Sequence, residues 1–242
     1  MSTGGTRARV GCSGYQYDHW RDVFYPRDIP RSRWFDHYAR HFDCVEINNT
    51  FYRLPDESAF ERWHDQTPPG FRYALKFSRY GTHMKKLKDP EEPIERFMSR
   101  AERLKSYLGP ILVQLPPGWR PEPERLDRFL RAAPGRRWAV EVRDPRWLAD
   151  EVIDVLERRG AALCLHDAIE DHPWIATTSW VYVRFHGGSG HGGSYSTSDL
   201  RRHAERLEGF LDDGLGLWVF FNNDLHGHAV RNAMELHGML QR

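Results

Sequence analysis

The sequence predicts a single (β/α)8 barrel that spans residues 1–242 as one domain. The length of 242 residues is close to the roughly 250 residues usual for such a barrel. Short strand-like runs alternate with helical stretches along the whole chain, and turn residues separate them. No low-complexity segment or linker interrupts this alternation. A single parallel, eight-stranded α/β domain is therefore expected.

Eight strands are predicted from short runs rich in β-branched, aromatic and aliphatic residues. They cover residues 8–13, 44–48, 71–77, 111–115, 138–143, 162–166, 180–186 and 217–222. Helical patterns are predicted over 31–42, 57–66, 92–108, 123–133, 147–160, 198–211 and 229–240. The weakest helix is expected at 168–178, which contains Pro173. We therefore expect the barrel to be somewhat irregular between strands six and seven.

An open, doubly wound sheet is the alternative fold. Such a sheet normally carries a GxGxxG fingerprint directly after its first strand. The corresponding segment here, GCSGYQYDHW at 11–20, does not match that fingerprint. The closed barrel is therefore the favoured prediction.

The composition is that of an ordinary globular protein, with 40% hydrophobic residues, 29% charged residues and a net charge of +1. This charge does not suit a non-specific nucleic-acid binder. No apolar run is long enough for a membrane span, and the first residues lack the apolar run of a secretion signal. We expect a cytoplasmic location and no membrane partner. Cys12, Cys44 and Cys164 are expected to be reduced core residues. The oligomeric state is not predicted.

The phase of each strand follows from the need for an apolar outer face under the helices. In the second strand, Val45 and Ile47 face outward, so Glu46 and Asn48 face the lumen. The same reasoning applied to all strands places a polar residue near every carboxyl end. The expected lumenal residues include Ser13, Glu46, Asn48, Lys76, Gln114, Glu141, Arg143, His166, Tyr182, Arg184, His186 and Asn222.

This convergence of polar side chains predicts a functional pocket at the mouth where the strands end. A barrel that needs only to be filled can use Val, Ile and Leu, whereas each unpaired buried charge costs several kcal/mol. The structural alternative is that the charges only pair and fill the lumen. Lys76, Arg143 and Arg184 outnumber Glu46 and Glu141. A small anionic ligand is therefore expected.

A second indication is the glycine-rich segment HGGSGHGGSY at 186–195. Loops after strands seven and eight commonly bind phosphate in barrels, and glycine lets backbone N–H groups turn toward an anion. Gly187 and Tyr195 are therefore expected to contact substrate. The alternative is a surface lid without a ligand.

Acid–base chemistry is assigned to Glu46 and Glu141, with Lys76 and His186 as further catalytic residues. No cofactor is predicted. Glu46, Glu141 and His186 are also metal-ligand types, but the lumenal cations disfavour a divalent metal. The expected substrate-binding residues are Asn48, Tyr52, Gln114, Arg143, Asp167, Arg184, Gly187, Tyr195, Asn222 and Asn223.

Six ordered motifs resemble the YecE-like family, also called domain of unknown function 72. They are VEINNTFYRLP, FRYALKFSRYGTH, ILVQLPPGW, AVEVRDPRW, YVRFHG and VFFNND with a following GHAVRNA. The resemblance covers nearly the whole chain and implies a TIM-type barrel. It also implies a loose relation to sugar isomerases and to barrels that act on abasic DNA, without an established reaction. The segment CLHDA at 164–168 departs from the family pattern, so His166 is a less secure site residue than Asp167.

Three functions compete at this point. The favoured one is an enzyme, of isomerase or hydrolase type, that acts on a small phosphorylated or carbohydrate-like substrate. The second is a barrel that binds or cleaves damaged or single-stranded DNA, with mouth aromatics holding a nucleotide. The third is a scaffold without catalysis.

Overall fold

The computed structural model describes residues 8–133, 135–188 and 193–241, and its fold is the predicted (β/α)8 TIM-like barrel. The parallel strands follow the order β1-β8-β7-β6-β5-β4-β3-β2 and alternate with helices. The strands are β1 Ala8–Cys12, β2 Cys44–Ile47, β3 Arg72–Lys76, β4 Leu108–Gln114, β5 Trp138–Glu141, β6 Ala162–His166, β7 Trp180–Phe185 and β8 Gly216–Phe221. The α-helices are α1 Trp34–Tyr38, α2 Asn49–Tyr52, α3 Glu57–Gln66, α4 Glu91–Ala101, α5 Pro123–Ala132, α6 Asp150–Arg159, α7 Thr197–Asp212 and α8 His228–Leu240.

The helices differ from the predictions where local backbone chemistry intervenes. The stretch predicted over 92–108 ends as an α-helix at Ala101 and continues as the 3-10 segment Glu102–Tyr107, with a positive φ at Lys105. Several short elements have no periodic pattern and were not predicted, among them α2 and the π-helical turn Tyr80–Met84. The helix expected at 168–178 was wrong, because residues 167–179 are all described and contain no helix, whereas the expected irregularity between β6 and β7 is confirmed.

The chain divides into two compact units. Among the described residues, the first unit comprises 8–46, 166–170 and 179–241, which include β1, β7, β8, α1, α7 and α8. The second comprises 47–165 and 171–178, which include β3, β4, β5 and the helices α2 to α6.

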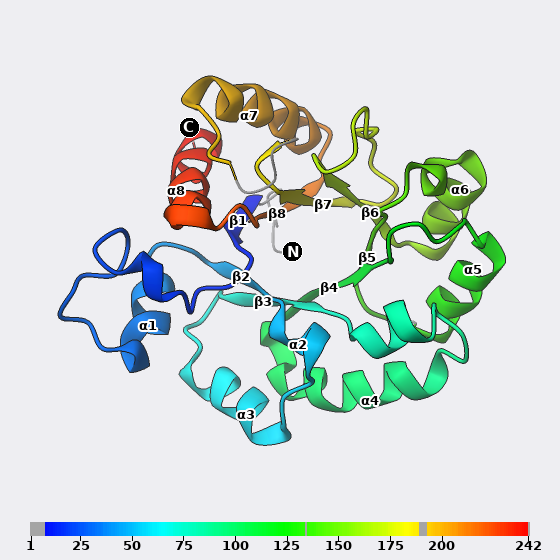
Figure 1. Ribbon diagram of the computed structural model, residues 1–242, viewed down its shortest axis with the longest axis horizontal. Coiled ribbons are helices and arrows are strands. Elements are labelled where there is room, and N and C mark those ends of the chain that lie inside the picture. Colours follow the sequence, from blue (N-terminus) through cyan, green and yellow to red (C-terminus); the bar gives the residue numbers. More distant parts are fainter. Residues whose placement is uncertain (1–7, 134, 189–192, 242) are drawn as a thin grey trace, which may run out of the picture. The chain divides into compact units, whose positions relative to one another are not determined.

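In the first unit, β8 pairs with β1 on one side and with β7 on the other. Helix α8 packs against β1 and β8, and α7 packs against α8 (Figure 1). The ring of Phe185 lies 4.5 Å from the ring of His203 on α7. Because successive side chains of a strand point to opposite faces, Arg184 and His186 lie on the face turned away from α7, as predicted.

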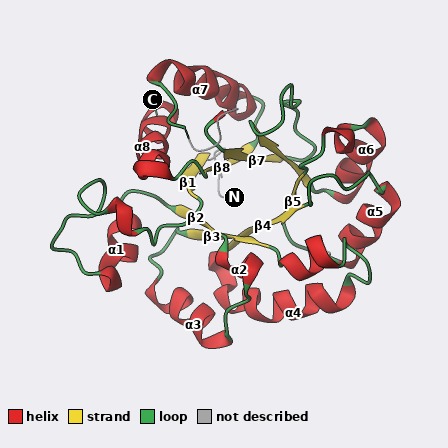
Figure 2. Ribbon diagram, viewed as in Figure 1, coloured by secondary structure: helices red, strands yellow, loops and turns green. Residues whose placement is uncertain are grey.

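In the second unit, β3, β4 and β5 pair in parallel, and helices α3 to α6 run along one side of them (Figure 2). Phe77, directly after β3, contacts Phe97 of α4 at 5.1 Å and Phe129 of α5 at 5.4 Å between ring centroids. Its neighbour Lys76 therefore points to the opposite face. The free cysteines Cys12, Cys44 and Cys164 are buried, which confirms that prediction.

The junction of β1 and β2, within the first unit, is held by a side chain. The hydroxyl of Tyr38 accepts a hydrogen bond from the backbone N–H of Cys12 at 2.9 Å and donates one to the carbonyl of Cys44 at 3.0 Å. A Cβ at Gly11 would lie 2.4 Å from the Cys44 carbonyl oxygen, so this approach requires glycine. Just beyond it, Ser13 forms a parallel bridge with Glu46. Tyr38 therefore fixes the register that sets Ser13 opposite Glu46.

We expect Tyr38→Phe to lower the free energy of unfolding by about 1–3 kcal/mol, because it leaves the buried Cys12 N–H and Cys44 carbonyl without their partner. Urea unfolding followed by circular dichroism measures this change. Tyr52→Phe is the control, because the Tyr52 side chain is 77% exposed. Equal stability of wild type and Tyr38→Phe would contradict the role given to this hydroxyl.

Candidate functional site

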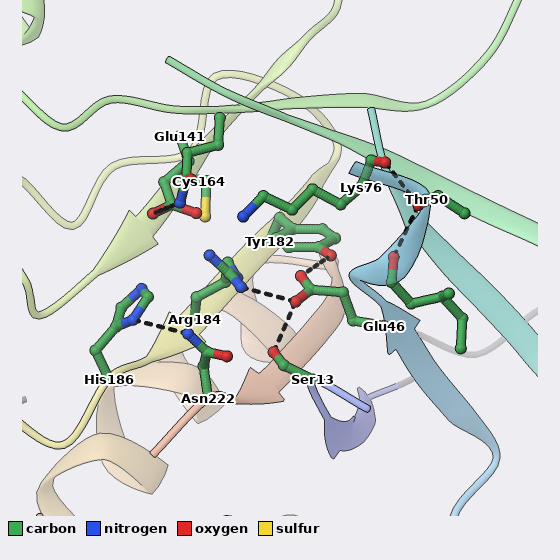
Figure 3. A network of polar contacts seen from close by, with 12 residues as sticks. Ser13, Glu46, Thr50, Lys76, Glu141, Cys164, Tyr182, Arg184, His186 and Asn222 are labelled. Atoms are coloured by element: carbon green, nitrogen blue, oxygen red, sulfur yellow. Dashed lines mark hydrogen bonds and ion pairs between the residues drawn. The ribbon is translucent and has the colours of Figure 1, made fainter. Parts of the chain in front are cut away.

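Glu46, at the end of β2, is the centre of a buried polar network in the first unit. Its Oε1 accepts hydrogen bonds from the hydroxyl of Ser13 at 2.6 Å and from Nη2 of Arg184 at 2.9 Å. Its Oε2 accepts one from the hydroxyl of Tyr182 at 2.6 Å (Figure 3). Glu46 is 0% exposed and Arg184 is 1% exposed. The ion pair and the two hydroxyl donors compensate the loss of hydration of this carboxylate.

The predicted strand phase placed the three partners of Glu46 in the lumen but did not identify them as its partners. Tyr182 and Arg184 occupy alternate positions on β7, so both point to the same face of that strand. Ser13 is held from the other side, because the hydroxyl of Tyr17 donates to its carbonyl oxygen at 2.6 Å. Burial, followed by the charge of Asp224, raises the pKa of Tyr17, so this phenol stays protonated and donates at neutral pH. The sequence placed Tyr182 in the lumen but did not select it as a site residue.

Two histidines stand at strand ends: His166 ends β6, and His186 follows β7 two residues after Arg184. The Nδ1 atom of His186 lies 3.2 Å from Nδ2 of Asn222, which follows β8. The rings of His166 and His186 meet edge to face with 5.9 Å between centroids. The N–H of Ala168 donates to Nδ1 of His166 at 3.2 Å, so the neutral His166 carries its proton on Nε2.

Asp167 occupies the backbone N–H groups that the glycine-rich segment was expected to offer to an anion. Its carboxylate accepts hydrogen bonds from the N–H of His186 and the N–H of Gly188, each at 2.8 Å, and from the hydroxyl of Tyr195. The N–H of Gly187 donates to Tyr195 Oη at 2.7 Å. Gly187 and Gly188 both have positive φ, which turns their N–H groups inward. The chain's own carboxylate therefore holds the described part of this loop, and residues 189–192 lie outside the described residues.

Asn232 of α8 is a structural partner of this loop that the sequence did not reveal. Its side-chain Oδ1 accepts from the N–H of Tyr195 at 3.2 Å and from Nδ2 of Asn223 at 2.9 Å. Its Nδ2 donates to the carbonyl of Tyr195 at 3.1 Å. The available signal was one asparagine in the apolar stripe of a helix, AVRNAMEL. Asn223 is 0% exposed. It contacts Asn232, which in turn holds the backbone of Tyr195.

Glu141, at the end of β5, is the buried carboxylate of the second unit. Its Oε1 accepts from Nε2 of Gln114 at 2.9 Å and forms an ion pair with Arg143. Glu141 is 0% exposed. The structure therefore brings together three predicted site residues from β4 and β5.

Lys76, at the end of β3, is 7% exposed and lies with its Nζ 4.4 Å from the centroid of the Phe51 ring. The hydroxyl of Thr50 donates to the carbonyl of Lys76 at 2.7 Å and is 3.1 Å from the carbonyl of Ile47 (Figure 3). This contact fixes the start of α2 against β3. His83 packs edge-on against Phe51, and burial followed by the charge of Lys76 lowers its pKa.

The remaining predicted residues of this unit flank α2. The carbonyl of Asn48 accepts the N–H of Phe51 at 3.1 Å. Tyr52 projects from the end of α2 and lines a cavity with Arg53 and Tyr80. Its contacts therefore differ from those of the buried strand-end residues.

Among the described residues, no group of three or more His, Cys, Asp and Glu side chains is arranged to hold a metal ion. Within the same residues, no helix has the length and apolar character needed to cross a membrane.

Asp144 organises the segment that follows Arg143. Its carboxylate accepts hydrogen bonds from Nε and Nη2 of Arg146 at 2.8 and 2.6 Å, and from the N–H of Arg146 at 3.1 Å. This capping starts the 3-10 turn Pro145–Leu148, which places Nε1 of Trp147 2.6 Å from the carbonyl oxygen of Trp119. The hydrogen bonds from Arg146 lower the pKa of Asp144 to about 2.

The family of the chain follows from comparison with known sequences. Residues 9–242 match the family described as protein of unknown function DUF72. The chain therefore belongs to this family of (β/α)8 barrels, as the strand-end motifs predicted. It is 37% identical over 116 residues to the UPF0759 protein YecE of Escherichia coli K12, an alignment that spans 47% of this chain and 43% of YecE. The alignment thus covers less than half of the length of that relative.

More distant relatives cover the chain more fully. The UPF0759 protein YunF of Bacillus subtilis is 23% identical over 271 residues, with 94% of this chain and 92% of YunF covered. A crystal structure of a DUF72 family protein from Thermotoga maritima has a TM-score of 0.88 and 28% identity, and covers 98% of this chain and 100% of that chain. A DUF72 family structure from Enterococcus faecalis has a TM-score of 0.84 at 19% identity, with 97% and 96% covered, and shows the shared fold.

We expect Asp167→Asn to destabilise the protein by about 1–3 kcal/mol, because an amide replaces one acceptor oxygen with an NH2 group that faces N–H and O–H donors. Thermal unfolding measures the loss. Asp212→Asn, at the exposed end of α7, is the control for the same chemical change. Limited proteolysis gives a local readout, since the variant should be cut faster after β7. Unchanged stability and cleavage would show that Asp167 does not hold the loop.

A pH dependence follows from Asp144. Because its folded-state pKa is lowered to about 2, while an unfolded Asp titrates near ~3.9, its contribution to stability is complete above the unfolded value. That contribution is lost as the pH falls from about 4 toward about 2. We therefore expect the stability difference between wild type and Asp144→Asn to be larger at pH 6 than at pH 2. Urea unfolding at several pH values measures it, and a constant difference would refute the assignment.

Proposed function

We propose that the chain is an enzyme that acts on a small anionic substrate, phosphorylated or carbohydrate-like, at the carboxyl ends of its strands. The observation that carries this proposal is the Glu46 network of the first unit, with Ser13, Tyr182 and Arg184. In characterised barrels of this type, catalytic residues come from the carboxyl ends of several strands. A position at these ends therefore supports a catalytic role.

The energetic cost of burying the Glu46–Arg184 ion pair supports a functional role for the network over a role in packing the lumen alone. A buried ion pair is often no more stable than well-packed apolar residues of similar volume, because both charges lose their hydration. Retention of a fully buried Glu46–Arg184 pair is therefore better explained by chemistry than by packing alone.

In this proposal, Glu46 and His186 carry out proton transfer. Three donors orient the carboxylate of Glu46, and Asn222 orients the ring of His186. A correctly positioned acid or base typically contributes about 10²–10⁴-fold to a rate. Because Asp167 already accepts the N–H groups of the loop, side-chain cations rather than the backbone would attract the substrate. Arg184 is one of them.

The residues of the second unit are included in the proposal because, in this fold class, catalytic residues stand at the carboxyl ends of the strands. Glu141, Lys76 and Gln114 stand at or directly beside the carboxyl ends of β3, β4 and β5. Glu141 is fully buried against Gln114 and Arg143, and Lys76 is 7% exposed, so both resemble Glu46 in burial. We therefore assign Glu141 and Lys76 to the same chemistry, with Asn48, Arg143 and Asn223 in substrate binding or positioning.

The test is a thermal-shift screen of the protein against phosphorylated sugars, free sugars, nucleotides, and short single-stranded and abasic DNA. We expect a phosphorylated sugar to raise the melting temperature of the wild type and of Glu46→Gln, because the variant keeps Arg184, and we expect turnover by the variant to fall by at least about 100-fold. Asp43→Asn is the matched control. Asp43 also pairs with an arginine, Arg9 at 2.9 Å, but it precedes β2. This variant should bind as the wild type does.

His186→Gln serves as a second variant, in case Glu46→Gln does not fold. It should retain binding and lose turnover. Stabilisation by DNA alone, with a steep salt dependence, would overturn the proposal in favour of a nucleic-acid-binding barrel. Stabilisation by none of these compounds, or equal turnover by wild type, Glu46→Gln and His186→Gln, would favour the non-catalytic scaffold.

A further inference from the structure

A cavity of about 300 Å³ lies in the second unit, between α2, the π-helical turn Tyr80–Met84 and the first turns of α4. Its wall includes the aromatic residues Phe51, Tyr52, Tyr80 and Phe97. The volume is at the lower end of the range for small-molecule sites in proteins. None of the proposed catalytic residues lines it. It is therefore a separate place at which a ligand could bind.

The aromatic wall is exposed in a way that packing does not explain. Tyr52 is 77% exposed and Tyr80 is 39% exposed, whereas Phe51 beneath them is 6% exposed. Exposed aromatic side chains beside a concave surface commonly mark a binding site, because they can cover the face of a ring or an apolar group. The two tyrosines thus favour a flat, partly apolar ligand.

Two arginines give the cavity its charge. Arg53 and Arg96 both line it, and the described lining residues include no carboxylate. Neither guanidinium forms an ion pair in the part of the chain that the structure describes. Arg100, one helical turn after Arg96, instead pairs with Glu57. Two exposed guanidinium groups without an acidic partner favour an anion, which each can bind through paired N–H donors.

The backbone beside the cavity is unusual. The turn Tyr80–Met84 is π-helical, and a Cβ at Gly81 would lie 2.5 Å from the ring of Phe77. Lys86 and Leu87, just after the turn, have positive φ. Single π-helical turns are frequent at functional sites, and residues with such backbone angles persist only where the surrounding structure holds them. This turn presents Tyr80 to the cavity.

We propose that this cavity binds an organic anion in which an aromatic ring is joined to a phosphate or carboxylate. Tyr52 and Tyr80 cover the ring, and Arg53 and Arg96 bind the acidic group. The site is distinct from the proposed catalytic residues and does not depend on their function. The ring and the acid have to belong to one molecule, because the aromatic and cationic side chains line a single cavity.

The test measures binding by isothermal titration calorimetry. The probe is phenyl phosphate, and inorganic phosphate and phenol represent its two halves. We expect saturable binding of phenyl phosphate and at least tenfold weaker binding of each half. Arg96→Gln and Arg53→Gln should each weaken phenyl phosphate binding by about tenfold, since each removes a charge-assisted contact. Tyr80→Ala should weaken phenyl phosphate more than inorganic phosphate. These side chains are exposed, so the variants should fold.

Arg79→Gln is the matched control, because Arg79 is an exposed neighbour of Tyr80 that does not line the cavity. It should change affinity less than twofold, and Glu46→Gln should also retain phenyl phosphate binding. Equal weakening by Arg79→Gln and Arg96→Gln would reduce the effect to general surface charge and overturn the proposal. Absence of saturable binding, or wild-type affinity in the double variant Arg53→Gln/Arg96→Gln, would overturn it as well.

Discussion

The loss of hydration at the Glu46 carboxylate is the constraint on which the arrangement of the first unit depends. A fully buried carboxylate is tolerated only when several donors reach it. Ser13 beside β1 and Tyr182 and Arg184 on β7 can all do so only if the strands keep one register. Tyr38 sets that register at the junction of β1 and β2. Burial of the Glu46 carboxylate therefore depends on the pairing of the strands, on Tyr38 of helix α1 and on the polar network together.

Much of the fold could be predicted because the outer faces of the strands must be apolar. This requirement fixed the phase of β7, and Phe185 against α7 confirms it. Elements without periodicity could not be found this way. Helix α2 spans only Asn49–Tyr52, and the turn Tyr80–Met84 is π-helical, so neither contains enough residues for a repeating pattern. Helix α2 is held by a tertiary contact, the hydroxyl of Thr50 on the carbonyl of Lys76.

The candidate site shows the same division. The alternation of side chains was enough to place Glu46, Arg184, Glu141 and Gln114 on the inward faces of their strands, where Arg184 contacts Glu46 and Gln114 contacts Glu141. It could not show which partner satisfies which group. The N–H groups of the glycine-rich segment donate to a carboxylate, but that carboxylate belongs to Asp167 at the preceding strand end. Sequence patterns give the position of donors, but they do not reveal that an acceptor is already supplied by another part of the chain.

The position of Asp167 also bears on selectivity. An anion from solution can reach the N–H groups of His186 and Gly188 only if Asp167 leaves them, and it must then also replace the contact with Tyr195. The internal carboxylate therefore acts as a built-in competitor. A common anion such as inorganic phosphate would have to displace this carboxylate to bind the same N–H groups.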